Sequence, residues 1–420
     1  MVINCPRGTA DIFGDDISYR DFIIESAKKL FKLFNYSEII TPAFEHTEVF
    51  NRGIGQSTDI VKKEMYTFPD KKGRSLTLRP EGTAPVVRAI IEHKLYSKVP
   101  IKLFYVENMF RYERPQKGRM REFWQLGVEA AGVNSPLIDA EVIWLLALIF
   151  EELGFKNLKL LVNSVGCDDC RPPYINVFKK YIEPQVESLC PDCRERYNTN
   201  PLRIFDCKVR SCGTIIEDSP KIYSHLCSGC TQHFKAVTSL LKSLNISFAV
   251  KEDLVRGFDY YTRTIFEIIS EDLESVQNAL GGGGRYDRLI EQFGGPPVPS
   301  IGFAVGIDRT IVLMKQLNIS CMQNEQENNV FVILLEQEFE GYGLEFLSYL
   351  RKHGIRCDIS FEIKKIAAQI KWAEKNGFTH TAIIGGDEAS SGIITVKRLK
   401  DFKQSQLNWK KDPQEINDIL

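Results

Sequence analysis

Five basic side chains gather in the short segment from Arg111 to Arg121, in which Glu113 is the only acidic residue. They are Arg111, Arg114, Lys117, Arg119 and Arg121, around a turn marked by Pro115 and Gly118. A solvated charged hairpin is one interpretation. The apolar runs Leu103–Val106 and Phe123–Trp124 on either side favour another, because they predict core strands that hold the basic loop on a rigid support, as a phosphate or RNA site requires.

A second segment, Leu254–Thr264, combines arginine and tyrosine with glycine. Arg256 precedes Gly257, where a ligand can approach the backbone closely, and the hydroxyls of Tyr260 and Tyr261 follow. Adjacent side chains of a strand point to opposite faces, so one alternative is that at least one tyrosine only packs in the core.

Four consecutive glycines, Gly281–Gly284, precede Arg285-Tyr286-Asp287. A flexible loop and a bulged strand both fit this run, but its cost in chain entropy favours a close backbone approach. The spacing G-x-G-x-x-G and a Lys-Ser/Thr pair after the glycines are both absent. A nucleotide bound here would therefore use neither a Rossmann nor a P-loop cradle.

Eight of the eleven cysteines form four pairs between residues 167 and 230. The pairs are Cys167 and Cys170, Cys190 and Cys193, Cys207 and Cys212, and Cys227 and Cys230. Their spacing is typical of two Cys₄ zinc sites. The alternative is that they are reduced packing cysteines in a region that folds without metal.

Composition limits the class of protein. The 420 residues, 43% hydrophobic and 26% charged, are enough for two or three domains. We expect a cytoplasmic protein with no membrane partner, because no apolar run of roughly 18 residues and no leader-like N-terminus is present. The net charge of −1 argues against holding nucleic acid through a global positive field, so RNA contacts are expected from local basic patches.

The elements that must position these residues differ along the chain. Apolar spacing predicts a helix over Ile17–Phe34. Strand-like runs follow without regular alternation with helices, which predicts a mixed or antiparallel sheet rather than a doubly wound parallel one. These runs are Arg79–Thr83, Lys102–Val106, Phe110–Tyr112 and Phe123–Val128.

The second half of the chain contains an insertion and a separate domain. The cysteine- and proline-rich residues 167–240 are expected to be an insertion in a first domain of residues 1–325. After a polar linker, regular alternation predicts a compact α/β domain over 328–420. Its expected strands are Val330–Leu335, Arg356–Ile359, Thr381–Ile384 and Ile393–Val396, with helices near Tyr342–Arg351 and along Ile363, Ile366, Ala367, Ile370 and Ala373.

Taken together, these segments resemble the histidyl-tRNA synthetase family, a class II family, over nearly the whole chain. The stretches that carry the resemblance are Arg7-Gly8-Thr9, Leu78–Thr83, FRYERPQKGRMREFWQLGVEA, LVRGFDYYTRT, GGGGRYD and SIGFAVGIDR. The pair LVRGFDYYTRT and GGGGRYD is the specific part, since other class II synthetases share the arginine motifs alone. The resemblance implies an α+β fold with an antiparallel catalytic sheet of six-stranded type, a helical Cys-rich insertion, a C-terminal α/β anticodon-binding domain, and a homodimer.

The resemblance also implies the reaction and the site. Histidine and ATP would give histidyl-adenylate, with Mg²⁺ bridging the phosphates, and tRNA(His) would then accept the histidyl group. The implied histidine-binding residues are Glu81, Gly82, Thr83, Arg111, Gln125, Glu129, Arg256, Tyr260, Tyr261 and Tyr286, with Glu129 and Tyr261 on the imidazole. The implied ATP-binding residues are Arg111, Glu113, Arg119, Phe123 and Arg309, and the catalytic pair is Arg111 and Arg256.

Two positions depart from the family pattern. Ser360–Lys365 stands where a glycine-rich turn is usual, which leaves the anticodon contacts open, and Arg288 stands where a small residue is more common. Two rival readings remain: a non-catalytic regulatory paralogue, and a zinc-stabilised RNA-binding module. The first typically lacks the C-terminal domain, and the second does not explain Glu81, Gln125 and Glu129.

Overall fold

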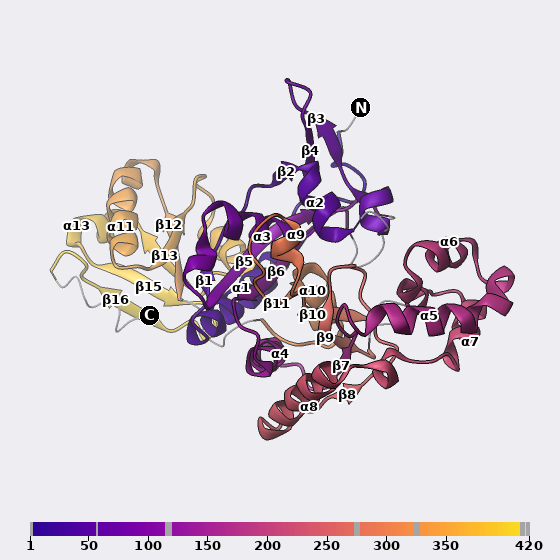
Figure 1. The fold of residues 1–420 in the computed structure, drawn as a ribbon. Helices are drawn as coiled ribbons and strands as arrows, with labels where there is room; N and C mark the ends of the chain where they lie inside the picture. The colour runs from indigo at the N-terminus through magenta and orange to yellow at the C-terminus, as the bar shows by residue number, and fades with distance from the viewer. Residues whose placement is uncertain are drawn as a thin grey trace. The chain divides into compact units, whose positions relative to one another are not determined.

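The computed structural model divides the chain into two compact units, residues 1–322 and 323–420 (Figure 1). It describes residues 3–55, 58–113, 120–272, 278–321, 328–411 and 416. Within these residues, no helix combines the length and apolar character that crossing a membrane requires.

The first unit is built on an eight-stranded sheet of order β1-β5-β6-β11-β10-β9-β7-β8. The bounds are β1 Ser37–Glu38, β5 Ile101–Phe110, β6 Glu122–Ala131, β11 Ser300–Gly306, β10 Ala279–Arg285, β9 Thr262–Ser270, β7 Leu158–Ser164 and β8 Ala249–Val250. The six inner strands pair antiparallel, and the two short edge strands pair parallel. The predicted antiparallel α+β sheet is therefore confirmed.

Two predicted strands are wrong. In the predicted strand Phe110–Tyr112, Arg111 and Tyr112 lie in no strand, since β5 ends at Phe110. Residues 79–82 form the turn between β4 (Ser75–Leu78) and α3 (Thr83–Glu92). The Glu81 carboxylate accepts hydrogen bonds from the backbone N–H groups of Thr83 and Ala84, each at 2.8 Å. It thereby satisfies two amides that an α-helix leaves without partners at its start, so a helix begins here.

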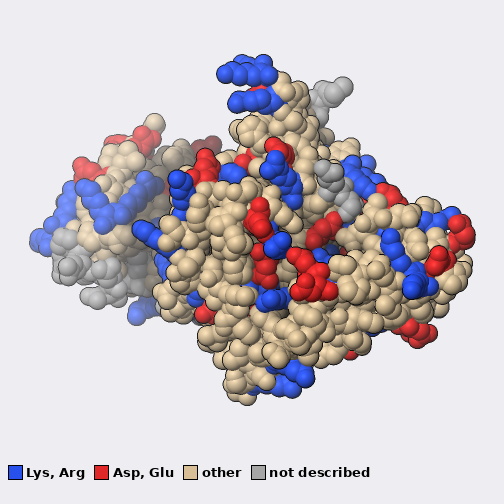
Figure 2. Space-filling view, in the orientation of Figure 1, with Lys and Arg blue, Asp and Glu red and all other residues tan. Residues whose placement is uncertain are grey.

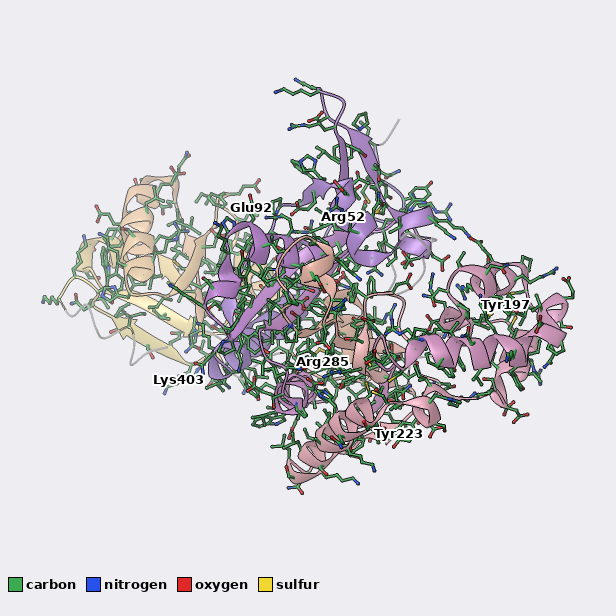
Figure 3. The ribbon with its side chains drawn as sticks, in the orientation of Figure 1. Arg52, Glu92, Tyr197, Tyr223, Arg285 and Lys403 are labelled. Atoms are coloured by element: carbon green, nitrogen blue, oxygen red, sulfur yellow. The ribbon has the colours of Figure 1, made fainter. Side chains whose placement is uncertain are left out.

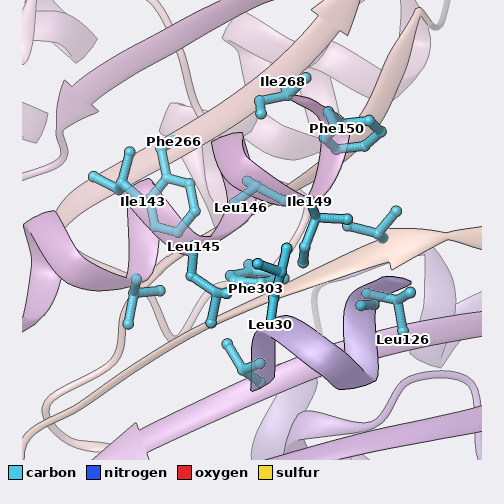
Figure 4. Close-up of a cluster of buried hydrophobic side chains, with 14 of the residues drawn as sticks. Leu30, Leu126, Ile143, Leu145, Leu146, Ile149, Phe150, Phe266, Ile268 and Phe303 are labelled. Carbon is cyan, nitrogen blue, oxygen red and sulfur yellow. The ribbon is translucent and has the colours of Figure 1, made fainter. Parts of the chain in front are cut away.

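Helices cover one face of the sheet with the main hydrophobic core (Figure 4). These are α1 (Asp15–Leu33), α4 (Pro136–Glu152), α8 (Ser228–Ser243) and α10 (Ile307–Gln316). The predicted first helix is confirmed, with Ile23, Ala27, Leu30 and Phe31 buried. In β6, Leu126 and Val128 face this core, so the alternate residues of the strand face the other way.

The other face carries α3, α9 (Leu289–Gln292) and a cluster that includes Tyr105, Tyr260, Tyr261 and Tyr286. Beside it lie α2 (Thr47–Ile54), the short turns η1 (Ile60–Glu64) and η2 (Leu95–Ser97), and a small sheet of β2 (Phe44–His46), β4 and β3 (Thr67–Pro69). Figure 2 shows basic side chains at the tip of the β3–β4 hairpin, at the top of the view.

Between β7 and β8 the chain leaves the sheet and forms the insertion, whose helices α5 to α7 lie together at the right of Figure 1. Its elements are α5 (Arg171–Ile182), η3 (Glu183–Ser188), α6 (Pro191–Thr199), η4 (Pro201–Asp206), α7 (Arg210–Glu217) and η5 (Ile222–His225). It has a small core of its own, containing Tyr174, Phe178 and Ile204. The following helix, α8, instead packs on the sheet through Phe234, Val237 and Leu241.

The second unit has a five-stranded sheet of order β13-β12-β14-β15-β16, in which β12 pairs parallel with β13 and β14. Its elements are β12 (Asn329–Leu334), η6 (Gln337–Phe339), α11 (Glu340–Lys352), β13 (Arg356–Ile359), α12 (Ile366–Lys375), β14 (His380–Ile384), α13 (Gly386–Ser391), β15 (Ile394–Arg398) and β16 (Gln404–Leu407). The α/β alternation is as predicted, but α12 begins at Ile366, so Ile363 precedes it. Its buried side chains are Gln369 and Ala373, whereas Ile366 is exposed.

Candidate active site

A cavity of about 680 Å³ opens on the face of the sheet opposite the main core. Strands β5, β6, β9, β10 and β11 contribute to its lining, as do α3, α10 and the insertion. Twelve of the fourteen predicted site residues line it: Glu81, Gly82, Thr83, Arg111, Glu113, Phe123, Gln125, Arg256, Tyr260, Tyr261, Tyr286 and Arg309. Arg119 lies outside the described residues. The structure thus brings together segments that are far apart in the sequence.

One set of side chains that line the cavity consists of an acid, an amide and tyrosines. Burial raises the pKa of the Glu81 carboxyl, while the two backbone N–H groups of α3 act in the opposite direction. Gln125 Oε1 is buried and has no hydrogen-bond partner in the described part of the chain. An unpaired buried acceptor is costly, so it indicates a place where a ligand donates.

The two adjacent tyrosines both line the cavity, because Tyr260 and Tyr261 lie in the turn before β9 and not in a strand. Their ring centroids are 4.7 Å apart, and the Tyr260 ring meets that of Tyr286 edge-on at 5.6 Å. The alternative in which one of them is only a core residue is therefore wrong. The packed rings make a rigid wall.

Glu129, which the family resemblance assigns to the imidazole, is not itself among the residues that line the cavity, whereas Thr83 and Tyr286, which contact it, are. Its assignment to the imidazole stays a prediction. Glu129 is 1% exposed and lies behind the lining, where it accepts hydrogen bonds from Thr83 Oγ1 at 2.7 Å and from the Tyr286 hydroxyl. Burial raises the pKa of Glu129 to about 8, although these two donors act to lower it.

Glycine creates the room for Glu129. A Cβ at Gly302 would lie 1.9 Å from Glu129 Oε2 and 2.4 Å from the Val128 carbonyl oxygen. Because such contacts are far shorter than van der Waals distances allow, a side chain at Gly302 and the observed Glu129 position exclude each other. The glycine run acts similarly: a Cβ at Gly284 would lie 2.9 Å from the Tyr261 ring. The run is strand β10, which excludes the flexible-loop alternative.

The second set of side chains that line the cavity consists of arginines. Arg111 donates from Nε to the Pro80 carbonyl oxygen at 2.8 Å, and its guanidinium lies 5.3 Å from the centre of the Phe123 ring. Arg309 donates to the Ala279 carbonyl oxygen at 2.6 Å. Burial lowers the pKa of both arginines. A neighbouring positive charge lowers it further in each case: that of Arg111 acts on Arg309, and that of Arg256 acts on Arg111.

Arg111 lies 4.0 Å from the Glu113 carboxylate, and Arg256 has a closer acidic partner. Its guanidinium pairs with the Glu267 carboxylate of β9, which also lines the cavity. Burial alone would lower the pKa of Arg256, but Glu267 and the nearby tyrosines more than offset it and raise the pKa. Converging guanidinium groups that repel one another in one cavity favour a polyanionic ligand such as a triphosphate.

Sequence reasoning missed the insertion's share of the cavity. Arg196, Arg203 and Asp206 line it, together with Cys190 and Cys207. Arg196 and Arg203 both contact the Asp59 carboxylate of the first unit's core at 3.1 Å. These partners are more than 130 residues apart, and no local sequence pattern signals them.

Two residues singled out in the sequence have structural surroundings instead. Arg285 is fully buried and pairs with Asp139, which also accepts from His233 at 2.7 Å; Figure 3 labels this arginine. Arg288 is exposed and pairs with Asp168 at 3.4 Å and Glu291 at 3.1 Å, so it is a surface residue outside the cavity.

The eight paired cysteines form two groups of four, as their spacing predicts. One group is Cys167, Cys170, Cys227 and Cys230, and the other is Cys190, Cys193, Cys207 and Cys212. Within each group all sulfur atoms lie within 4.8 Å of one another. Both groups therefore have the donor set and the spacing that hold a metal ion.

Comparison with known proteins agrees with this architecture. The family model for histidyl-tRNA synthetase matches residues 8–167 and 213–310, and an anticodon-binding domain model matches residues 329–418. A histidine–tRNA ligase of Halothermothrix orenii is 46% identical over 97% of both chains, and one of Natranaerobius thermophilus is 43% identical over 100% of both. The crystal structure of apo S. aureus histidyl-tRNA synthetase superposes with a TM-score of 0.83, 35% identity and 99% coverage of both chains. The chain therefore belongs to the histidyl-tRNA synthetase family.

Proposed function

We propose that this chain ligates L-histidine to tRNA(His) at the expense of ATP, through a histidyl-adenylate intermediate. The supporting observation is one cavity lined by two unlike sets of side chains. A buried acid, an unpaired amide oxygen and tyrosine hydroxyls suit a small amino acid, and three guanidinium groups suit a triphosphate. The reaction needs those two substrates side by side.

In the first set, Glu81, Thr83 and Gln125 receive the histidine ammonium group. An ammonium group has only donors, so it pairs with the carboxylate and with the open acceptor at Gln125 Oε1. Glu129 and Tyr261 meet the imidazole, and Tyr260 and Tyr286 wall it in. Glu129 fixes Thr83 and Tyr286 through its two hydrogen bonds. Gly82 keeps the site open, because a Cβ there would lie 2.3 Å from the Tyr105 ring.

In the second set, Arg111 and Arg256 contact the α-phosphate, and Arg309 contacts the distal phosphates. Phe123 stacks on the adenine and Glu113 accepts from its amino group. Arg119, which lies outside the described residues, is assigned to the distal phosphates as well. Guanidinium groups fixed before the reaction stabilise the charge that develops on phosphate oxygens without reorganising.

The first step needs no base. The histidine carboxylate, ionised near neutral pH, attacks the α-phosphorus, and the bond to the bridging oxygen breaks to release pyrophosphate. In the second step a hydroxyl of the tRNA 3′-terminal ribose attacks the activated carbonyl carbon, and AMP leaves. Arg111 and Arg256 serve both steps by holding the α-phosphate.

Several carboxylates line the cavity, Glu267 among them, and carboxylate, phosphate and water oxygens are the ligands that Mg²⁺ prefers. Bound Mg²⁺ would neutralise charge on the triphosphate. The two cysteine groups fit a different ion, Zn²⁺, in a structural role.

The proposed domains are a catalytic domain of residues 1–325, with an insertion at about 167–240, and an anticodon-binding domain of residues 328–420 that recognises tRNA(His). The proposed assembly is a homodimer, as the family resemblance implies. The proposed compartment is the cytoplasm, where charged tRNA is used.

Amino-acid-dependent exchange of labelled pyrophosphate into ATP tests this function. The protein is incubated with ATP, labelled pyrophosphate and each of the twenty amino acids separately. Exchange with histidine alone, followed by transfer of labelled histidine to tRNA(His), is the expected result. Absence of exchange with every amino acid would instead support the hypothesis of a regulatory paralogue or of an RNA-binding module.

A further inference from the structure

Both cysteine groups have the sulfur spacing of an occupied tetrahedral site. Zinc bonded to four thiolates at about 2.3 Å requires neighbouring sulfurs about 3.8 Å apart. In the first group, Cys167 Sγ lies 3.6 Å from Cys170 Sγ and 3.9 Å from Cys227 Sγ. In the second, Cys190 Sγ lies 3.8 Å from Cys207 Sγ. A disulfide would need about 2.05 Å, and all eight cysteines are free thiols.

Backbone N–H groups point at the same sulfurs. The N–H of Cys227 donates to Cys170 Sγ at 3.0 Å, and that of Cys230 to Cys227 Sγ at 3.4 Å. In the second group the N–H of Cys190 donates to Cys212 Sγ at 3.3 Å. Thiols are weak acceptors, whereas metal-bound thiolates carry the negative charge that such donors stabilise.

The first group lies where the insertion meets the sheet. Cys167 and Cys170 follow β7, where the chain departs, and Cys227 and Cys230 lie at the start of α8, where it returns. One ion would therefore tie the two crossings together. Arg171, directly after Cys170, donates to the backbone carbonyl of Tyr261, which lines the cavity. The residue next to a cysteine of the first group therefore contacts the cavity wall.

The second group closes a loop that forms part of the cavity. Cys190 and Cys193 lie at the start of α6. Cys207 directly follows η4, and Cys212 lies in α7. Between them, Arg196 and Arg203 reach Asp59, and Asn200 Nδ2 donates to Asp259 Oδ1 at 2.6 Å. Cys190 and Cys207 themselves line the cavity. The loop's own core is small, so a metal is the natural means of holding its shape.

We propose that each group binds one Zn²⁺, and that the second ion holds the insertion's wall of the ligand cavity, so that zinc occupancy controls ATP affinity. The coupling rests on the function proposed above, and the zinc sites do not. The ion acts through Arg196, Arg203 and Asp206, which it positions beside the site. Zn²⁺ takes no part in the reaction.

Metal analysis of the purified full chain tests the two sites. The expected content is two zinc ions per chain, falling to one in Cys170→Ser and to one in Cys212→Ser. Cys321→Ser and Cys357→Ser, outside both groups, should keep two. Bound Co²⁺ should give the visible spectrum of tetrahedral thiolate coordination. Absence of zinc from a folded protein, disulfides within the groups, or bound iron would overturn the sites.

Calorimetric titration with ATP tests the coupling. Cys212→Ser, and wild-type protein stripped of zinc by a chelator, should bind ATP about five-fold or more weakly, within the usual range of site-to-site coupling. Protease cleavage within residues 190–209 should increase in parallel, and adding zinc back to the stripped protein should restore both. Unchanged ATP affinity after complete zinc loss would overturn the coupling. Wild-type protein with two zinc ions that neither binds ATP nor exchanges pyrophosphate would overturn the proposed function and leave the sites standing.

Discussion

Arg256 gives the sharpest test of the active-site assignment. Its guanidinium lines the cavity and pairs with the Glu267 carboxylate, and its Nε has no hydrogen-bond partner in the described part of the chain. Arg256→Ala therefore has two effects. It removes one of the guanidinium groups proposed to hold the α-phosphate, and it leaves a carboxylate that is only 18% exposed without its cation.

The two effects differ in size and in what they change. Removing one preorganised donor to a developing oxyanion typically costs about 2.7–4 kcal/mol, or about 10²–10³-fold in rate. Pyrophosphate exchange at saturating histidine should fall by that factor. Histidine affinity should change by less than about tenfold, below about 1.4 kcal/mol, because Glu81 and Gln125 still bind the ammonium group.

Exchange kinetics and a separate histidine titration measure the two quantities. Arg288→Ala, at an exposed arginine outside the cavity, is the matched control and should resemble the wild type. Adding Glu267→Gln to Arg256→Ala should recover thermal stability, since it removes the unpaired carboxylate, without recovering the rate. Equal losses of rate and histidine affinity in Arg256→Ala would refute the assignment of Arg256 to the transition state.

Three further outcomes are expected. Gly302→Ala should destabilise the protein to urea by roughly 1–3 kcal/mol and weaken histidine binding, because its Cβ would meet Glu129 at 1.9 Å; Gly306→Ala, with 4.0 Å to its nearest neighbour, should unfold like the wild type. Glu129, with its pKa raised to about 8, keeps a proton in the folded state that the unfolded chain loses near pH 4.5, so wild-type stability should fall as pH rises through that window. Glu129→Gln cannot lose this proton, so the difference between its melting temperature and that of the wild type should increase from pH 5 to 8. Melting temperatures of the two proteins that change in parallel with pH would contradict the raised pKa of the buried Glu129 carboxyl. Asp139→Asn leaves buried Arg285 without its main anion and should cost about 3–5 kcal/mol in denaturant unfolding, whereas a cost under about 1 kcal/mol would mean that the network is not coupled.

Periodicity predicts the parts of the fold that local sequence controls. The helix α1 and the alternation in the second unit follow from apolar spacing, and both are present. The prediction fails where a side chain competes with the pattern. Residues 79–83 have strand-like composition, but Glu81 accepts two N–H groups and starts a helix. At α12, apolar spacing favoured Ile366, yet Gln369 is buried because its amide donates to the Leu334 carbonyl.

Motifs predict which residues share the site but not their depth or all their neighbours. The cavity collects nearly every residue that the family resemblance implies. Glu129 is buried, and its carboxylate occupies the space that a side chain at position 302 would fill, which glycine leaves free. The insertion's contribution depends on contacts such as Arg203 with Asp59, which join residues 144 positions apart. No local rule encodes a pairing at that distance.

The glycines of β10 and β11 explain how one sheet serves both stability and catalysis. On one face, Leu126 and Val128 of β6 fill a core; on the other, Gln125 and Glu129 of the same strand serve the site. Gly302 pairs with Glu129 and leaves out a side chain that would occupy the space of its carboxylate, and Gly284, next to Gly302 on β10, leaves out one that would meet Tyr261. Each glycine costs chain entropy in a strand, roughly 0.5–1 kcal/mol relative to alanine. The apolar face offsets that cost, so the cavity is produced by omitting side chains from a stable sheet rather than by opening the sheet.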